Sequence, residues 1–117
     1  MTASNPVLRQ TLVMLEKAGK KEKAPIWHVA SKVLSNPAVN RVEVNLSRIS
    51  RVAKSDHPLF VPGKVLGTGL IDKRVIIGAF SFSSTARSKI EASGGTALSV
   101  KEFLRKFPKG NGVKLVQ

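Results

Sequence analysis

The chain contains no cysteine and no tyrosine, and only seven of its 117 residues are acidic. Without cysteine it forms no disulfide, carries no thiol nucleophile and has no cysteine-based metal site. No apolar run approaches the roughly 20 residues that a membrane span needs. The first residues lack the basic-then-apolar layout of a secretory signal peptide, so we expect a cytoplasmic protein.

Groups that carry acid–base or nucleophilic chemistry are few and scattered. The two histidines, His28 and His57, fall in different local contexts, and no two carboxylates form a close pair for general acid and base catalysis. No spacing resembles a metal site, and no nucleophile elbow surrounds any serine. We therefore expect neither enzymatic activity nor a bound metal or cofactor.

Three glycines, Gly63, Gly67 and Gly69, suggest a phosphate cradle, but their spacing argues against a nucleotide site. The third glycine of a dinucleotide fingerprint would fall at Asp72. A Walker motif needs Ser or Thr after Gly-Lys, where this chain has Val65. The glycines instead indicate tight turns or close backbone packing, or a turn whose N–H groups face RNA phosphates.

Positive charge is what the chain has in excess. Twenty Lys and Arg residues against seven acids give a net charge of +13 and a pI near 10.9. Such an imbalance destabilises a compact chain by self-repulsion and is typical of proteins whose partner is a polyanion. Ten basic residues precede His57 and ten follow it. This even spread favours a folded domain embedded in nucleic acid over a neutral domain with a basic arm.

With 117 residues the chain is long enough for one hydrophobic core but not for two, and a hydrophobic content of 42% is typical of a globular protein. The order of patterns predicts a single small α/β domain over 1–117, with a mainly helical basic part over 1–56 and an α/β core over 57–117. Helices are expected over 5–18, capped by Ser4 or Asn5 and stopped by Gly19, and from Pro25 to about Ser35.

A turn at Ser55-Asp56-His57-Pro58 opens the second half, where short strands alternate with helices in irregular β-β-α units. The strands are expected over 59–61, 64–66, 75–82, 96–100 and 113–116. Ser83 or Ser84 caps the first helix, and Gly94 occupies the place of a left-handed C-cap. The second helix begins with a capping box, Ser99-x-x-Glu102.

Residues 40–54 are predicted as one amphipathic helix. At helical spacing the apolar stripe consists of Val42, Leu46, Ile49 and Ala53. The opposite side carries Arg41, Asn45, Arg48 and Arg51. On such a helix the apolar side packs on the core while the arginines on the other side are free to bind a phosphate backbone. The alternative is a solvated face, which normally has interleaved glutamates, and this segment has only Glu43.

Three other features have both a structural and a functional interpretation. Residues 17–24 carry four lysines and are either a solvated loop or a loop that contacts phosphates. Trp27 is predicted to anchor the core of its helix rather than to stack on a base. Residues 77–82 resemble an RNA-recognition strand, but Phe80 and Phe82 lie in a run that is predicted to be buried. We therefore expect recognition of RNA shape and backbone.

Five segments spread over the chain carry a family resemblance when taken together: APIW (24–27), EVNLSRISR (43–51), VPGKVLGTG (61–69), AFSFSSTAR (79–87) and EASGG (91–95). They resemble the large-subunit ribosomal protein eighteen-e family of archaea and eukaryotes, the counterpart of bacterial ribosomal protein fifteen. The resemblance covers essentially the full chain. It implies a small α/β fold bound to large-subunit ribosomal RNA beside other ribosomal proteins, as a structural component without catalytic activity.

The resemblance does not identify RNA contacts, so these are predicted from charge and helix phase. The candidate RNA-binding residues are Lys20, Lys21, Lys23, Arg41, Asn45, Arg48, Arg51, Lys64, Lys73, Arg74, Arg87, Lys109 and Lys114. The expected function is that of a ribonucleoprotein component in translation, on cytoplasmic ribosomes. Two alternatives are a free-standing RNA-binding or RNA-chaperone protein outside the ribosome and a small nucleotide-dependent enzyme.

Overall fold

A computed structural model describes residues 6–37, 41–53 and 57–117 of the chain. Helices and strands alternate through most of this length. The described elements are α1 (Pro6–Glu22), α2 (Pro25–Leu34), β1 (Val42–Asn45), α3 (Leu46–Val52), β2 (Leu59–Leu66), β3 (Ile76–Phe82), α4 (Ser84–Ala92), β4 (Thr96–Leu98), α5 (Val100–Lys106) and β5 (Lys114–Leu115). The α/β fold class predicted from the sequence is confirmed. The predicted cap at Ser4 or Asn5, and residues Ser55 and Asp56 of the predicted turn, lie outside the described residues.

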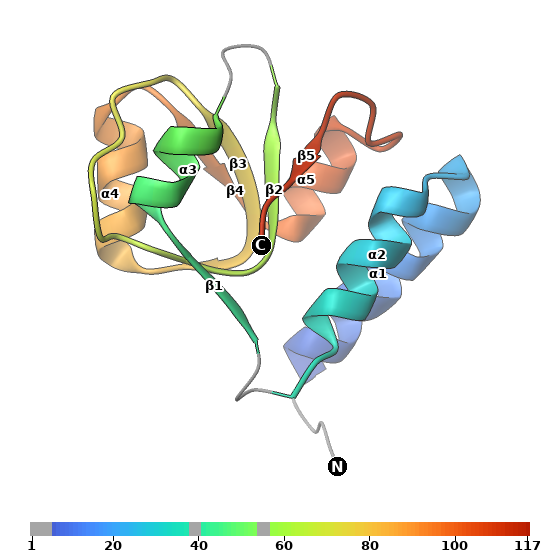
Figure 1. The fold of residues 1–117 in the computed structure, drawn as a ribbon. Coiled ribbons are helices and arrows are strands. Elements are labelled where there is room, and N and C mark those ends of the chain that lie inside the picture. The colour runs from blue at the N-terminus through green and yellow to red at the C-terminus, as the bar shows by residue number, and fades with distance from the viewer. Residues whose placement is uncertain (1–5, 38–40, 54–56) are drawn as a thin grey trace.

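The strands form one parallel sheet in the order β1-β2-β3-β4. The fifth described strand, β5, pairs with the first residues of β2, while β1 pairs with the last residues of the same strand. Both therefore lie along one edge of β2, with β3 along the other (Figure 1). Because all pairings are parallel, the carboxyl ends of the strands meet at one end of the sheet, where α3, α4 and α5 begin.

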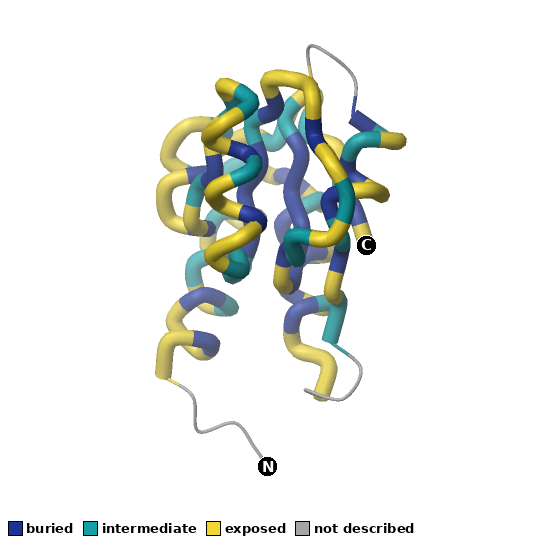
Figure 2. The backbone as a smooth tube through the Cα atoms, turned by 90° about the vertical axis from the view of Figure 1, so that its left-hand side faces the viewer, coloured by how far each residue is buried: buried dark blue, intermediate teal, exposed yellow. Residues whose placement is uncertain are grey.

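Helices cover both faces of the sheet, which is the usual arrangement for parallel strands (Figure 1). On one face α3 and α4 pack on the apolar side chains that alternate along β2 and β3, such as Val61 and Ile77. On the other face α1, α2 and α5 enclose Phe60 of β2 and the partly buried Phe80 of β3. Figure 2 shows the buried positions along the strands and the inward sides of the helices.

Trp27 lies at the centre of the second core, as predicted, and has no solvent exposure. Its ring meets Phe60 and Phe103 edge-on, with centroid separations of 5.5 and 6.0 Å. The indole Nε1 donates a hydrogen bond of 2.8 Å to the carbonyl oxygen of Pro108. This bond ties α2 to the turn that follows α5. Among the described helices, none combines the length and apolar character that crossing a bilayer requires.

The prediction of one helix over 40–54 is wrong. Val42–Asn45 forms β1, and the helix begins only at Leu46. Val42 and Val44 alternate with polar residues, and this period-two signal is satisfied by parallel pairing with residues 63–66 of β2. The sheet therefore overrides the helical phase that the segment shares with Leu46 and Ile49.

Three other boundaries differ from the prediction. The strand predicted over 96–100 ends at Leu98, because Ser99 caps α5 and Val100 is already helical. Helix α1 continues past Gly19 to Glu22, because Gly19 is buried against the ring of His28 and needs no turn. The predicted strands at 59–61 and 64–66 form one strand through Pro62. A register shift between Val61 and Lys64 in the pairing with β3 accommodates the proline, which has no N–H to donate.

Candidate nucleic-acid interface

The lysines and arginines in the described part of the chain form no ion pairs with carboxylates. Every Lys and Arg except Lys54 lies in the described ranges. Within those ranges the one ion pair closer than 4.0 Å joins His28 to Glu16, with Nδ1 and Oε1 2.9 Å apart. No described lysine or arginine forms such a pair. Exposed cations without a carboxylate partner are available for an anionic partner.

Two of the described carboxylates, Glu16 and Glu102, are engaged by local hydrogen-bond donors. Hydrogen bonds from Ser31 and then His28 lower the pKa of Glu16. The backbone N–H of Ser99 lowers the pKa of Glu102 in the same way, through a bond of 2.9 Å. Both acids stabilise helix contacts, so they do not neutralise the basic surfaces described below.

Helix α3 presents two arginines on a buried support. Leu46 and Ile49 have no solvent exposure and fix the helix on the sheet, while Arg48 and Arg51 are exposed on its outer side. The N–H of Ser47 donates to the carbonyl of Thr68, which holds the glycine loop beside the first turn of the helix. The two arginines are therefore carried on a rigid element.

The loop that returns from β2 to β3 brings further basic residues to α3. Lys73 Nζ donates to the carbonyl oxygens of Ser50 and Ala53, each at 3.3 Å, and so caps the C-terminal end of the helix. Arg74 follows it and lies against Gly94 at the end of α4. Together these residues form a basic surface on one face of the sheet. We call it the α3–loop surface; its members are Arg48, Arg51, Lys73 and Arg74.

The glycine loop packs closely on its neighbours. Gly69 has a φ of +102°, and a Cβ there would lie 2.6 Å from the backbone nitrogen of Ser47. Lys89 Nζ donates to the carbonyl oxygens of Gly67 and Gly69, each at 2.8 Å. Lys89 therefore points from α4 toward the glycine loop and not into solvent. The half-buried lysine holds the glycine loop in place. The sequence around α4 does not reveal this role, because Gly69 is 20 residues away in the chain.

A second basic surface lies at the tip of the α1–α2 hairpin. Lys20 and Lys21 belong to the last turn of α1 and not to a loop, which corrects the prediction for 17–24. Lys23 follows with a φ of +51°. The bond from Trp27 to Pro108 places the turn after α5 beside the start of α2, so Lys109 lies at the same end. We call Lys20, Lys21, Lys23 and Lys109 the hairpin surface.

Three predicted residues near β1 and β2 do not join either surface. Arg41 precedes β1, and its Nη2 donates to the carbonyl of Asn36 at 3.3 Å. Asn45 is the last residue of β1 and the N-cap of α3. Within the described part of the chain, its buried Oδ1 has no hydrogen-bond partner, and neither does the buried Nε of Arg41. Lys64 is exposed on β2, with Glu43 as its register partner on β1.

The last two predicted residues are also separate. The Arg87 guanidinium lies 5.1 Å from the centroid of the Phe82 ring, in a cation–π contact, and its Nη1 approaches the carbonyl of Ala97 at 3.5 Å. Lys114 pairs with Leu59 at the amino end of β2. Four further basic residues, which were not selected from the sequence, line a groove between α1 and α5: Arg9, Lys17, Lys101 and Arg105. In the sequence these residues are related only by helical spacing within each of two separate helices, and this spacing does not predict that the helices lie side by side.

Fold and surfaces together define a small basic α/β domain built to present cations on both sides of a rigid sheet. A family model that describes the ribosomal proteins 50S-L15 and 50S-L18e, together with a 60S counterpart, matches residues 59–98, which span β2 to β4. The Large ribosomal subunit protein eL18 of Methanococcus maripaludis is 43% identical over 97% of this chain and 95% of its own.

Two further relatives carry the same name. That of Archaeoglobus fulgidus is 41% identical over 99% of both chains. That of Methanothermobacter thermautotrophicus is 39% identical over the full length of this chain and 97% of its own. The chain belongs to the large ribosomal subunit protein eL18 family. The resemblance noted in the sequence is thereby confirmed.

Proposed function

We propose that this protein is a structural, non-catalytic constituent of the large ribosomal subunit that binds ribosomal RNA, on ribosomes in the cytoplasm and beside other ribosomal proteins. The observation that carries the proposal is the α3–loop surface, where Arg48 and Arg51 stand on a buried helix without carboxylate partners. The names of the full-length relatives support the same conclusion.

The mechanism is phosphate neutralisation by preformed surfaces. The planar guanidinium groups of Arg48 and Arg51 suit bidentate contacts with phosphate oxygens. The α3–loop surface and the hairpin surface belong to helices on opposite faces of the sheet (Figure 1). The domain therefore bridges two RNA segments and holds them at a fixed separation. With roughly 6–10 phosphates contacted, affinity falls about a thousandfold or more between 50 and 200 mM salt.

The test is the double variant Arg48→Glu with Arg51→Glu, measured by anisotropy on a fragment of large-subunit ribosomal RNA across a salt series. We expect weaker binding and a salt slope smaller by about 1 for each phosphate that the variant no longer neutralises. The matched control is Lys32→Glu with Lys106→Glu, which makes the same charge change at exposed positions outside both surfaces. Equal weakening in both variants would show non-specific attraction and would contradict the proposal.

Placement on the ribosome is tested separately. The protein is expected to co-sediment with large subunits after a high-salt wash, because a component built into the RNA is retained when loosely attached proteins are removed. Recovery of the protein only in the free fraction, with RNA binding intact, would identify a free-standing RNA-binding protein instead. Circular dichroism of the double variant checks that the arginines are not needed for folding.

A further inference from the structure

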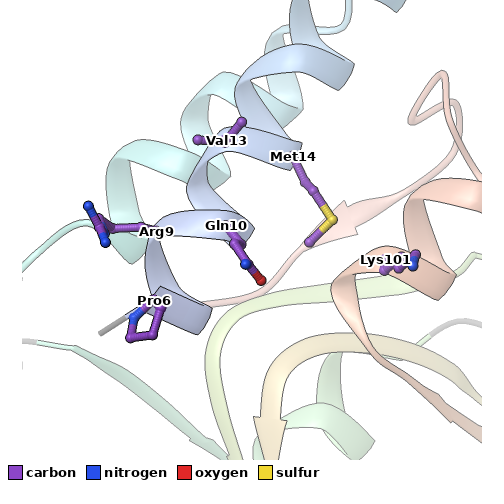
Figure 3. A pocket seen from close by; sticks show the side chains of 6 residues that line it. All are labelled: Pro6, Arg9, Gln10, Val13, Met14 and Lys101. Atoms are coloured by element: carbon purple, nitrogen blue, oxygen red, sulfur yellow. The ribbon is translucent and has the colours of Figure 1, made fainter. Parts of the chain in front are cut away.

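A groove runs between α1 and α5, on the side of the sheet away from the α3–loop surface. Two connected hollows of about 580 and 360 Å³ share Met14 and Lys101 in their linings, so they form one continuous groove. Figure 3 shows Met14 and Gln10 of α1 directed toward the gap, with Lys101 of α5 across from them. The groove extends from Pro6 at one end to Pro108 at the other.

The floor of this groove is mostly aliphatic, with the side-chain amide of Gln10 at one end. Val13 is 50% exposed, and Met14, Ala18 and Leu104 are partly exposed beside it. An apolar strip of this kind on a strongly charged protein marks a contact site. Methionine adapts its shape to a partner, which suits a docking surface.

The rim of the groove is basic. It carries Arg9, Lys17 and Lys21 from α1 and Lys101 and Arg105 from α5, against the single acid Glu22. None of the described residues that line the groove is aromatic, so it offers no platform for stacked bases. Phosphates alone would leave the aliphatic floor exposed. An aliphatic floor between basic rims therefore favours a protein segment over RNA.

We propose that the α1–α5 groove binds an acidic amphipathic helix of a protein partner. The apolar side of that helix covers Val13 and Met14, and carboxylates on its two flanks meet Arg9 and Lys101 across the groove. Helix α1 has 17 residues and is about 25 Å long, which accommodates three to four turns of a partner helix. The proposal goes beyond RNA binding and does not depend on it.

The experiment uses the full chain and an 18-residue probe peptide with leucine at helical i, i+3, i+4 and i+7 positions and glutamate elsewhere. Affinity is measured by fluorescence anisotropy at about 150 mM salt, where long-range attraction is screened. A scrambled peptide of the same composition, in which the leucines share no face, is the probe control. We expect the scrambled peptide to bind about tenfold more weakly.

Two matched pairs of variants test the floor and the rim of the groove. Val13→Ser on the floor is compared with Val29→Ser on α2, whose side chain is 46% exposed and lies outside the groove. Arg9→Glu with Lys101→Glu on the rim is compared with Arg48→Glu with Arg51→Glu, an equal charge change on the opposite face. We expect each groove variant to weaken peptide binding about tenfold, and each control to stay within about twofold.

Three results would overturn the proposal. Equal weakening by both charge variants would show general attraction to a chain of +13. Unchanged binding in Val13→Ser would show that the apolar floor is not used. Loss of RNA affinity in Arg9→Glu with Lys101→Glu, without peptide binding by the wild type, would identify the groove as an RNA surface. Failure of the RNA proposal appears separately, as intact RNA affinity in Arg48→Glu with Arg51→Glu.

Discussion

At the scale of single residues, close backbone approach explains why glycine stands at Gly63. A Cβ at this position would lie 2.1 Å from the backbone oxygen of Val42, inside the ladder that joins β1 to β2. A backbone atom in a sheet cannot move aside as a flexible side chain can. At Gly78 the obstacle is a side chain: a Cβ would lie 2.4 Å from the ring of Phe103, which is fully buried and packed against other aromatic rings.

We expect Gly63→Ala to lower the free energy of unfolding by about 3 kcal/mol, because β1 must separate from β2 to admit the methyl group. The measurement is urea denaturation followed by the fluorescence of Trp27, the only tryptophan, which is fully buried. Gly112→Ala is the comparison. Its nearest atom is 3.7 Å away, so it costs only the strain of a φ of +73°, about 1–2 kcal/mol. Equal destabilisation by both substitutions would contradict the steric explanation.

Lys89 is a structural lysine in a protein whose other charges mostly face solvent. Its substitution Lys89→Met keeps the length of the side chain and removes both hydrogen bonds to the glycine loop. We expect a decrease of about 1.5–3 kcal/mol in the free energy of unfolding, the usual range for hydrogen bonds from a charged group. The same change at exposed Lys106 should stay within about 0.5 kcal/mol. If both variants behaved alike, the contacts of Lys89 would not be stabilising.

At the scale of elements, local signals predict the second half of the chain well. Ser83 caps α4 by accepting a hydrogen bond from the N–H of Ala86, and Gly94 has the left-handed φ of +85° expected after a helix. The capping box at the start of α5 is formed by Ser99 and Glu102. These features depend on residues three or four apart, so a pattern in the sequence contains them fully.

Elements that depend on distant partners could not be predicted in this way. β1 is a strand only because residues 63–66 are present to pair with it. The same distinction between local and distant signals applies to the residues of the candidate site. Exposure of Arg48 and Arg51 follows from helix phase and was predicted. The capping of α3 by Lys73 depends on a loop that returns 20 residues later, which no local pattern encodes.

The capping box of α5 makes a prediction about pH. The N–H of Ser99 holds the pKa of Glu102 below its ordinary value of 4.5, so the folded state favours the carboxylate. This stabilisation is complete above the ordinary pKa and is lost as the pH falls through the lowered pKa of Glu102. We therefore expect wild type to be more stable than Glu102→Gln at neutral pH, and the two to converge in acid. Denaturation curves at several pH values measure this; a constant difference down to pH values below the lowered pKa would contradict it.

The hydroxyl of Ser99 makes a second hydrogen bond in the same cap. Ser99→Ala removes the bond of 3.2 Å that the side-chain oxygen accepts from the N–H of Glu102. We expect a decrease of about 1 kcal/mol in the free energy of unfolding, the typical cost of deleting an N-cap. Ser84→Ala, one residue past the cap of α4, is the control and should change little. Thermal denaturation compares the two; an unchanged Ser99→Ala would show that the carboxylate alone maintains the cap.

At the scale of the whole molecule, a parallel sheet covered on both faces carries a charge of +13 with little internal compensation. The domain has a radius of gyration of only 13.5 Å, so its cations are crowded around a small volume. When the protein is free in solution, its lysines and arginines therefore repel one another, and a bound polyanion would reduce this repulsion. The core must tolerate this repulsion until the partner binds.

Salt should consequently act in opposite directions on folding and on RNA binding. Between about 50 and 500 mM salt the Debye length falls from about 14 to about 4 Å, which screens repulsion among exposed lysines and arginines. We expect the melting temperature of the free protein to rise, on the order of 5 °C for each kcal/mol of repulsion removed. RNA affinity should fall over the same range, because the release of counterions on binding is less favourable at high salt.

The variant Arg48→Glu with Arg51→Glu separates this effect from general salt stabilisation. Its charge is lower by four, from +13 to +9, so its melting temperature should rise less between the same salt concentrations. Scanning calorimetry of both proteins in sodium chloride measures the difference. A rise of equal size in the variant would mean that salt strengthens apolar burial and does not relieve charge repulsion. A smaller rise would show that the unpaired arginines of α3 cost stability in the free protein, as expected for residues retained for an anionic partner.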